Sequence, residues 1–192
     1  ALGYQKVLSM LNTKYVVIDG NNPPLRYPYS YGNCWLVEDV VLVENADEEI
    51  GTIALIDPEK AVILSNRDEA VAKCGITPKS NYSGDGSIVL THYAPNELKY
   101  KFHSECDQLA LFSEIYYPAG WMATIDGKET DILRADYAFR ALAVPAGDHE
   151  IVFRFEPQSY HTGTTVSRIT SSMLWILLLA LAAIGLINRR RK

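Results

Sequence analysis

The sequence is poor in cysteine, with three among its 192 residues: Cys34, Cys74 and Cys106. They lie far apart, and no CxxC pair or Cys/His group has metal-ligand spacing, so no zinc site can be read from the sequence. One disulfide could form in an oxidising compartment. Reduced, buried thiols are at least as good an interpretation. Cysteine therefore does not decide the compartment.

The familiar catalytic motifs are also missing: the sequence has no Walker loop, GxGxxG, HExxH or GxSxG. The Gly-Asp-Gly at 84–86 lacks the further carboxylates that a calcium loop needs, so it predicts a turn. The four histidines are dispersed near strand edges or loops, which is typical of surface or packing residues: His92, His103, His149 and His161. We therefore predict no catalytic residue, no metal and no cofactor.

Basic residues are scarce outside the C-terminus. The chain has 18 Lys and Arg residues, four of them at 189–192, against 23 Asp and Glu. The part before this basic tail has a formal charge of −9. Nucleic acid and anionic lipid headgroups are poor partners for such a surface.

One long apolar run is present, because residues 169–187 contain no charge and are followed by Arg189, Arg190, Arg191 and Lys192. This length approaches the roughly 20 residues that cross a hydrocarbon core as a helix. The basic residues predict a cytoplasmic tail at 188–192 and an extracytoplasmic domain at 1–168. A buried helix of a soluble protein is the alternative, but such a helix would show a polar stripe.

The chain begins with Ala1, and no signal sequence precedes the domain that we place outside the membrane. An outside domain has to be translocated. We therefore expect the chain to be a piece of a longer membrane protein. A tail-anchored protein fits poorly, because such proteins keep their bulk in the cytoplasm.

The pattern before the apolar run is mainly β. We predict an antiparallel β-sandwich or jelly-roll-like extracytoplasmic domain with one or two short helices, at 4–11 and 46–57, followed by the transmembrane helix. The clearest sandwich part is 86–157. Strands are predicted at 14–19, 34–37, 40–44, 61–64, 87–93, 97–104, 109–115, 121–125, 130–134, 138–144 and 150–155.

Two turns and one alternating strand support this prediction. Asp126-Gly127 is a strong type I′ hairpin signal, because that turn needs positive φ at both central positions. Residues 145–148 predict a second hairpin. In the last strand, Ile151, Phe153 and Phe155 share one face, as expected of a sheet with one face on a core.

Aromatic and charged residues are densest at 113–140. A sugar-binding surface needs aromatic faces beside polar partners for hydroxyl groups. The candidate glycan-binding residues are Tyr116, Tyr117, Trp121, Arg134, Asp136, Tyr137 and Arg140. The alternative is that the aromatic side chains pack the sandwich while the charged residues pair along strand edges.

The same stretch, FSEIYYPAGWMATIDGKETDILRADYAFRALAVPAGDHEIVFRFEP, resembles the C-terminal signature of bacterial YfhO-like membrane proteins. The resemblance extends to VLSMLNTKYVVIDG and YGNCWLV before it and to YHTGTTVSRITS after it, so it covers nearly the whole chain. One departure is Ala119, which lengthens the turn that the family tends to write as Tyr-Pro-Gly-Trp.

The resemblance implies a large polytopic protein with GT-C-type glycosyltransferase architecture, of which some members are linked to glycosylation of cell-envelope polymers from a lipid-linked sugar. In GT-C enzymes the catalytic carboxylate lies in an early extracytoplasmic loop, outside these residues. No catalytic residue is therefore carried over, and Asp136 is not assigned as a general base.

The leading hypothesis is the C-terminal extracytoplasmic domain and last membrane span of a YfhO-like protein of the bacterial cytoplasmic (inner) membrane. The domain would support sugar transfer to envelope glycans without being catalytic. Its expected partners are the bilayer, the parent protein's other transmembrane helices, and a lipid-linked sugar or envelope glycan. The alternatives are a membrane-anchored carbohydrate-binding or adhesion module and a purely structural ectodomain.

Overall fold

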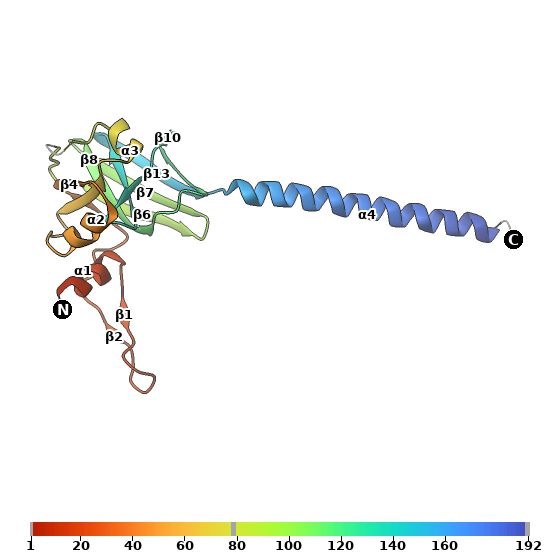
Figure 1. Cartoon of the computed structure of the whole chain (residues 1–192), viewed down its shortest axis with the longest axis horizontal. Coiled ribbons are helices and arrows are strands. Elements are labelled where there is room, and N and C mark those ends of the chain that lie inside the picture. Colours follow the sequence, from red (N-terminus) through yellow and green to blue (C-terminus); the bar gives the residue numbers. More distant parts are fainter. Residues whose placement is uncertain (1, 78–79, 191–192) are drawn as a thin grey trace. The chain divides into compact units, whose positions relative to one another are not determined.

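The computed structural model describes residues 2–77 and 80–190. The chain divides into two compact units, Ala1–Phe155 and Glu156–Lys192. The first is the β-rich part and the second is the long helix α4, drawn in blue in Figure 1. Each unit is described by itself.

The first unit contains a five-stranded antiparallel sheet. Its strand order is β10 (Lys128–Thr130), β9 (Trp121–Ile125), β13 (Gly147–Phe155), β7 (Glu97–Ser104) and β6 (Ser87–Ala94). The β9–β10 hairpin confirms the predicted type I′ turn, with φ of 52° at Asp126 and 78° at Gly127. Asp126 also accepts hydrogen bonds from the Glu150 N–H (2.8 Å) and from the His149 ring (2.6 Å), which ties the turn to β13.

A six-stranded sheet faces the first one. Its order is β3 (Cys34–Val37), β8 (Gln108–Ile115), β12 (Phe139–Val144), β11 (Leu133–Ala135), β5 (Ala61–Ser65) and β4 (Asp39–Val43). The β4–β5 pair is parallel, unlike the other pairs. The helix α2 (Ala46–Ile53) lies between these strands in the sequence, and parallel neighbours need such a crossover.

Helix α2 begins at residue 46, as predicted, and has a capped N-terminus. The Asn45 side chain accepts a hydrogen bond from the Glu48 N–H at 3.0 Å, and the Glu48 carboxylate accepts one from the Glu44 N–H at 3.0 Å. The first of these bonds satisfies an amide group that the first turn of a helix leaves free, and the second holds the residue before the cap. The helix ends at Ile53, before the predicted end at residue 57.

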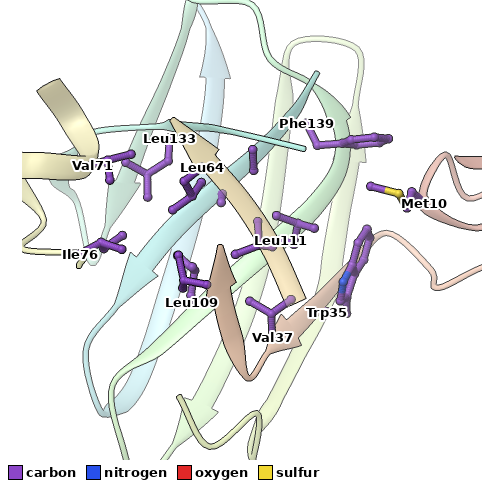
Figure 2. Close-up of a cluster of buried hydrophobic side chains, with 14 residues drawn as sticks. Met10, Trp35, Val37, Leu64, Val71, Ile76, Leu109, Leu111, Leu133 and Phe139 are labelled. Carbon is purple, nitrogen blue, oxygen red and sulfur yellow. The ribbon is translucent and has the colours of Figure 1, made fainter. Parts of the chain in front are cut away.

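Two hydrophobic cores lie on the two faces of the six-stranded sheet. The core between the sheets contains a cluster of edge-to-face rings, with centroids 4.9 Å apart for Tyr100–Phe112 and for Phe112–Phe153. The other core, shown in Figure 2, brings Met10 against Trp35 and Phe139. The residues from Leu109 to Phe112 are consequently all fully buried, and β8 shows no polar alternation.

The predicted hairpin at 145–148 is wrong. Strand β12 pairs with β8 and β11, whereas β13 pairs with β7 and β9, so these residues carry the chain from one sheet to the other. Both hydrogen-bonding edges of each strand are already occupied. A turn sequence fixes a local reversal of the chain but not the strand that the next segment joins.

Short elements account for the other differences. Helix α1 (Leu2–Met10) corresponds to the helix predicted at 4–11, and a further short helix, α3 (Glu69–Lys73), was not predicted. The strand predicted at 14–19 is reduced to β1 (Tyr15–Val16), which pairs with an unpredicted β2 (Leu25–Arg26). The described residues are therefore mainly β, as predicted.

The second unit is the helix α4 (Gln158–Arg190). Its segment Gln158–Ile184 is long and apolar enough to cross a membrane, and the described residues hold one such helix. Thr170 and Ser172 donate their hydroxyls to the carbonyls of Val166 and Arg168, at 2.9 and 2.8 Å, which satisfies them within the helix. Of the predicted topology residues, Arg191 and Lys192 lie outside the described residues.

Candidate functional site: an arginine-floored pocket

A pocket of about 430 Å³ opens beside β9 and β10. Four of the seven predicted glycan-binding residues line it: Tyr116, Tyr117, Trp121 and Arg140. The other lining residues are Ala70, Pro118, Met122, Ala123, Glu129, Thr130, Asp131 and Ile132. This set is called the Arg140 pocket below.

Arg140 is near the start of strand β12, which positions its side chain in this pocket. Its side chain is buried, with 2% of the residue exposed, and its Nε donates to the Ile115 carbonyl at 2.9 Å. The guanidinium carbon lies 4.2 Å from the ring centroid of Trp121, which is a close cation–π contact. Nη1 has no hydrogen-bond partner among the described residues.

The charge of Arg140 persists despite its burial. Desolvation lowers the pKa of this guanidinium, while the negative charge of Glu114 opposes the shift. An arginine starts from so high a pKa that it stays protonated. The pocket is thus lined by a buried cation, which attracts the oxygen atoms of a bound molecule.

The aromatic lining offers one freely accessible ring. Trp121 has the Arg140 guanidinium over its ring and lies 5.3 Å from Phe155 between ring centroids. Tyr117 is 54% exposed and approaches Phe155 at 6.2 Å. Tyr117 is therefore the side chain that can stack against a ligand, while Trp121 supports the arginine.

Carboxylates complete the lining. Glu129 belongs to β10 and Asp131 follows it, and neither was predicted as a site residue. The register Thr130↔Ala123 places β10 directly beside β9. The Asp126-Gly127 hairpin signal could have shown that Glu129 lies beside β9, because a two-residue hairpin fixes which residues lie opposite one another. Asp131 lies 3.9 Å from Lys73, an exposed and weak pair.

Three predicted residues do not line the pocket. Arg134, Asp136 and Tyr137 instead surround Glu49, a buried residue of α2, and we call these four residues the Glu49 cluster. The Arg134 guanidinium lies 3.1 Å from the Glu49 carboxylate. The same carboxylate accepts the Tyr137 N–H at 2.6 Å, and Arg134 donates to the Tyr137 carbonyl at 3.0 Å.

Asp136 is a buried acid of this cluster with one unpartnered oxygen. One carboxylate oxygen accepts the Ile63 N–H at 2.8 Å, and the other has no partner among the described residues. Burial, together with the charge of Glu49, raises the pKa of Asp136 to about 7, against the opposing hydrogen bond. Asp136 and Tyr137 both have positive φ, 45° and 71°, so the turn itself is strained.

The remaining reactive side chains lie apart from the pocket. His103 pairs with Asp148 at 2.8 Å and His149 with Asp126 at 2.6 Å, and the latter contact raises the pKa of His149. Across residues 2–77 and 80–190, no group of three or more His, Cys, Asp or Glu residues could hold a metal ion.

The three cysteines have free thiols. Burial raises the pKa of Cys34 to about 12 and also raises that of Cys74, whereas Cys106 is exposed. Because the thiolate is the reactive form, Cys106 is the thiol that a reagent in solution would meet first.

A β-sandwich joined to a helix that can span a bilayer defines a class, the membrane proteins with a β-rich domain. Comparison with protein families is more specific. Residues 79–167 match the family described as "Bacterial membrane protein YfhO". This confirms the resemblance predicted from the sequence for residues 79–167, which are similar to that membrane-protein family.

One curated relative supports the same assignment. The uncharacterized protein YfhO of Bacillus subtilis (strain 168) is 32% identical over 75 residues, which are 39% of this chain. The match spans 9% of the length of that relative. No solved structure matches the chain. Together with the helix α4, the family is consistent with association with a lipid bilayer.

Proposed function

We propose that this chain is the C-terminal extracytoplasmic domain and last membrane span of a polytopic YfhO-like protein of the bacterial cytoplasmic membrane. In this proposal the domain supports transfer of sugars from a lipid-linked donor to envelope glycans by holding a sugar unit in the Arg140 pocket. It does not catalyse the transfer, because the resemblance assigns the catalytic carboxylate to a loop outside these residues.

The buried Arg140 cation that lines the pocket is the observation that carries the proposal. A sugar hydroxyl both donates and accepts hydrogen bonds, so a sugar site needs donors and acceptors around an apolar face. Arg140 supplies donors, Glu129 supplies acceptors, and Tyr117 supplies an accessible ring. The volume lies within the range of about 300–1,000 Å³ that is usual for small-molecule pockets.

The Tyr117→Ala substitution is the sharpest test, because Tyr117 is exposed and its loss leaves the core intact. We expect it to weaken sugar binding by about five- to tenfold, the effect of losing about 1–1.5 kcal/mol of ring contact. Affinity is measured with the full chain in detergent micelles, by saturation-transfer NMR over a panel of neutral saccharides.

The control is Tyr93→Ala, which removes a comparably exposed tyrosine from β6, outside the pocket. Affinity should not change in this variant. Absence of saturable binding, or an equal loss in both variants, would contradict the sugar site and favour a purely structural domain. Sugar transfer from a polyprenyl-phosphate donor by residues 1–192 would contradict the non-catalytic role.

A singly anchored carbohydrate-binding or adhesion module would use the same pocket. The reading frame before Ala1 distinguishes the two hypotheses: many hydrophobic spans favour the polytopic protein, and a single signal peptide favours the anchored module.

A further inference from the structure

An apolar arm extends from the β-rich unit at residues 14–29. Its two short strands pair through Tyr15↔Arg26 and Val16↔Leu25 and lie beside each other in Figure 1. The base of the arm is attached to α1, because the Tyr27 hydroxyl donates to the Gln5 carbonyl at 2.9 Å and lies 3.0 Å from Ser9 Oγ. Beyond the base, every residue from 17 to 26 is exposed.

The arm exposes large apolar side chains. The exposed fractions of Tyr15, Val17, Ile18, Leu25 and Tyr29 range from 56 to 74%. A ladder of two residue pairs is too short to be stable alone in water. Contiguous exposed apolar side chains mark an interaction surface.

The order of residues along the arm indicates which partner covers it. Lys14 and Arg26 lie near the base with the tyrosines, and the aliphatic side chains of Val17, Ile18 and Leu25 lie further out. Tyrosine and basic residues favour the headgroup level of a bilayer, whereas aliphatic side chains favour the acyl boundary. The turn beyond them is polar, since Asp19 accepts hydrogen bonds from Asn21 and Asn22 at 2.8–2.9 Å. A polar turn suits an arm that lies in the plane of the interface.

Two further observations favour a lipid surface over a second copy of the chain. The chain carries its own candidate membrane helix, so a bilayer is present at high effective concentration. A second copy would bring the same acidic surface, with a formal charge of −9 before the basic tail, and the two would repel each other.

We propose that the arm binds the headgroup–acyl boundary of the bilayer through Val17, Ile18 and Leu25 and thereby holds the β-rich unit at the membrane surface. The proposal uses the membrane helix and is independent of the sugar pocket.

The test places a polarity-sensitive dye on the arm of the full chain in phosphatidylcholine vesicles. The labelled variant is Ile18→Cys in a Cys106→Ser background, in which Cys34 and Cys74 react slowly because burial raises the pKa of each thiol. The matched control carries the dye at Glu105→Cys, a position whose side chain is 93% exposed. Near-UV circular dichroism verifies that both variants fold.

We expect nitroxide lipids labelled near the headgroup to quench the dye at position 18 several-fold more than the dye at position 105. Adding Leu25→Ser and Val17→Ser to the labelled chain should reduce that quenching. Equal quenching at both positions would overturn the proposal. Lipid-independent self-quenching of the dye at position 18 with rising protein density would also overturn it, because it would assign the arm to a second copy.

Discussion

Replacing Glu49 with alanine is expected to lower the free energy of unfolding of the β-rich unit by about 3 kcal/mol, because it removes a buried carboxylate that accepts a backbone hydrogen bond and is paired with the partly exposed Arg134. Glu49 is fully buried, pairs with Arg134 at 3.1 Å and accepts the Tyr137 N–H at 2.6 Å. Its loss leaves that N–H and the guanidinium without their partner and opens a void beneath α2.

The measurement is urea unfolding of the full chain in detergent micelles, followed by the near-UV circular dichroism of the β-rich unit. Asp47→Ala is the matched control, because it removes an exposed carboxylate from the same helix. The control substitution should lower the free energy of unfolding by less than about 1 kcal/mol. Equal effects of the two substitutions would show that the Glu49 cluster does not hold α2.

Asp136→Asn is expected to remove most of the pH dependence of stability between pH 4 and pH 7. The folded-state pKa of Asp136 is raised from 3.8 to about 7, so the folded chain keeps a proton that the unfolded chain loses over this range. Deprotonation therefore stabilises the unfolded state as the pH rises. The free energy of unfolding of the wild type falls by up to about 4 kcal/mol and levels off above pH 7. Asparagine still accepts the Ile63 N–H and tolerates positive φ.

This prediction is measured by comparing the two chains at pH 4.5 and pH 7.5 in the same unfolding experiment. The comparison must be between variants, because His149 acts in the same direction. The pKa of His149 is raised by Asp126, so the stability from that pair is present at low pH and is lost as the pH rises through the folded-state value. An identical pH dependence in the wild type and Asp136→Asn would contradict the ionisation of a buried Asp136.

Most strands of the second half could be predicted because their signals are local, but the strand predicted at 130–134 is wrong, since these residues are divided between β10 in one sheet and β11 in the other. Asp126-Gly127 specifies its own turn, and the inward face of β13 appears as the alternation of Ile151 and Phe153, both buried. The parallel β4–β5 pair and the sheet change at 145–147 could not be predicted, because they depend on which strand edges remain free after the others have paired. Helix α3 is too short to show a helical period.

The candidate site was predicted in part, for a related reason. Arg134 and Arg140 are opposite each other in the β11–β12 register, but only Arg140 lines the pocket. Like charges directly opposite one another in a sheet are unfavourable. Here Arg134 forms an ion pair with Glu49, which lies far earlier in the sequence, and Arg140 makes a cation–π contact with Trp121. The local sequence pattern does not show an ion pair with a residue of a distant helix, so the different positions of the two arginine side chains could not be predicted.

The proposed function requires the β-rich unit to lie on the extracytoplasmic side of the membrane. Cys106 allows a direct measurement, because it is exposed in this unit and has a free thiol. Intact bacterial cells carrying the protein are treated with a small charged maleimide that does not cross the cytoplasmic membrane, and Cys106→Ser cells give the background. We expect labelling of intact cells that the Cys106→Ser substitution abolishes. Labelling of Cys106 only after the cells are permeabilised would contradict it.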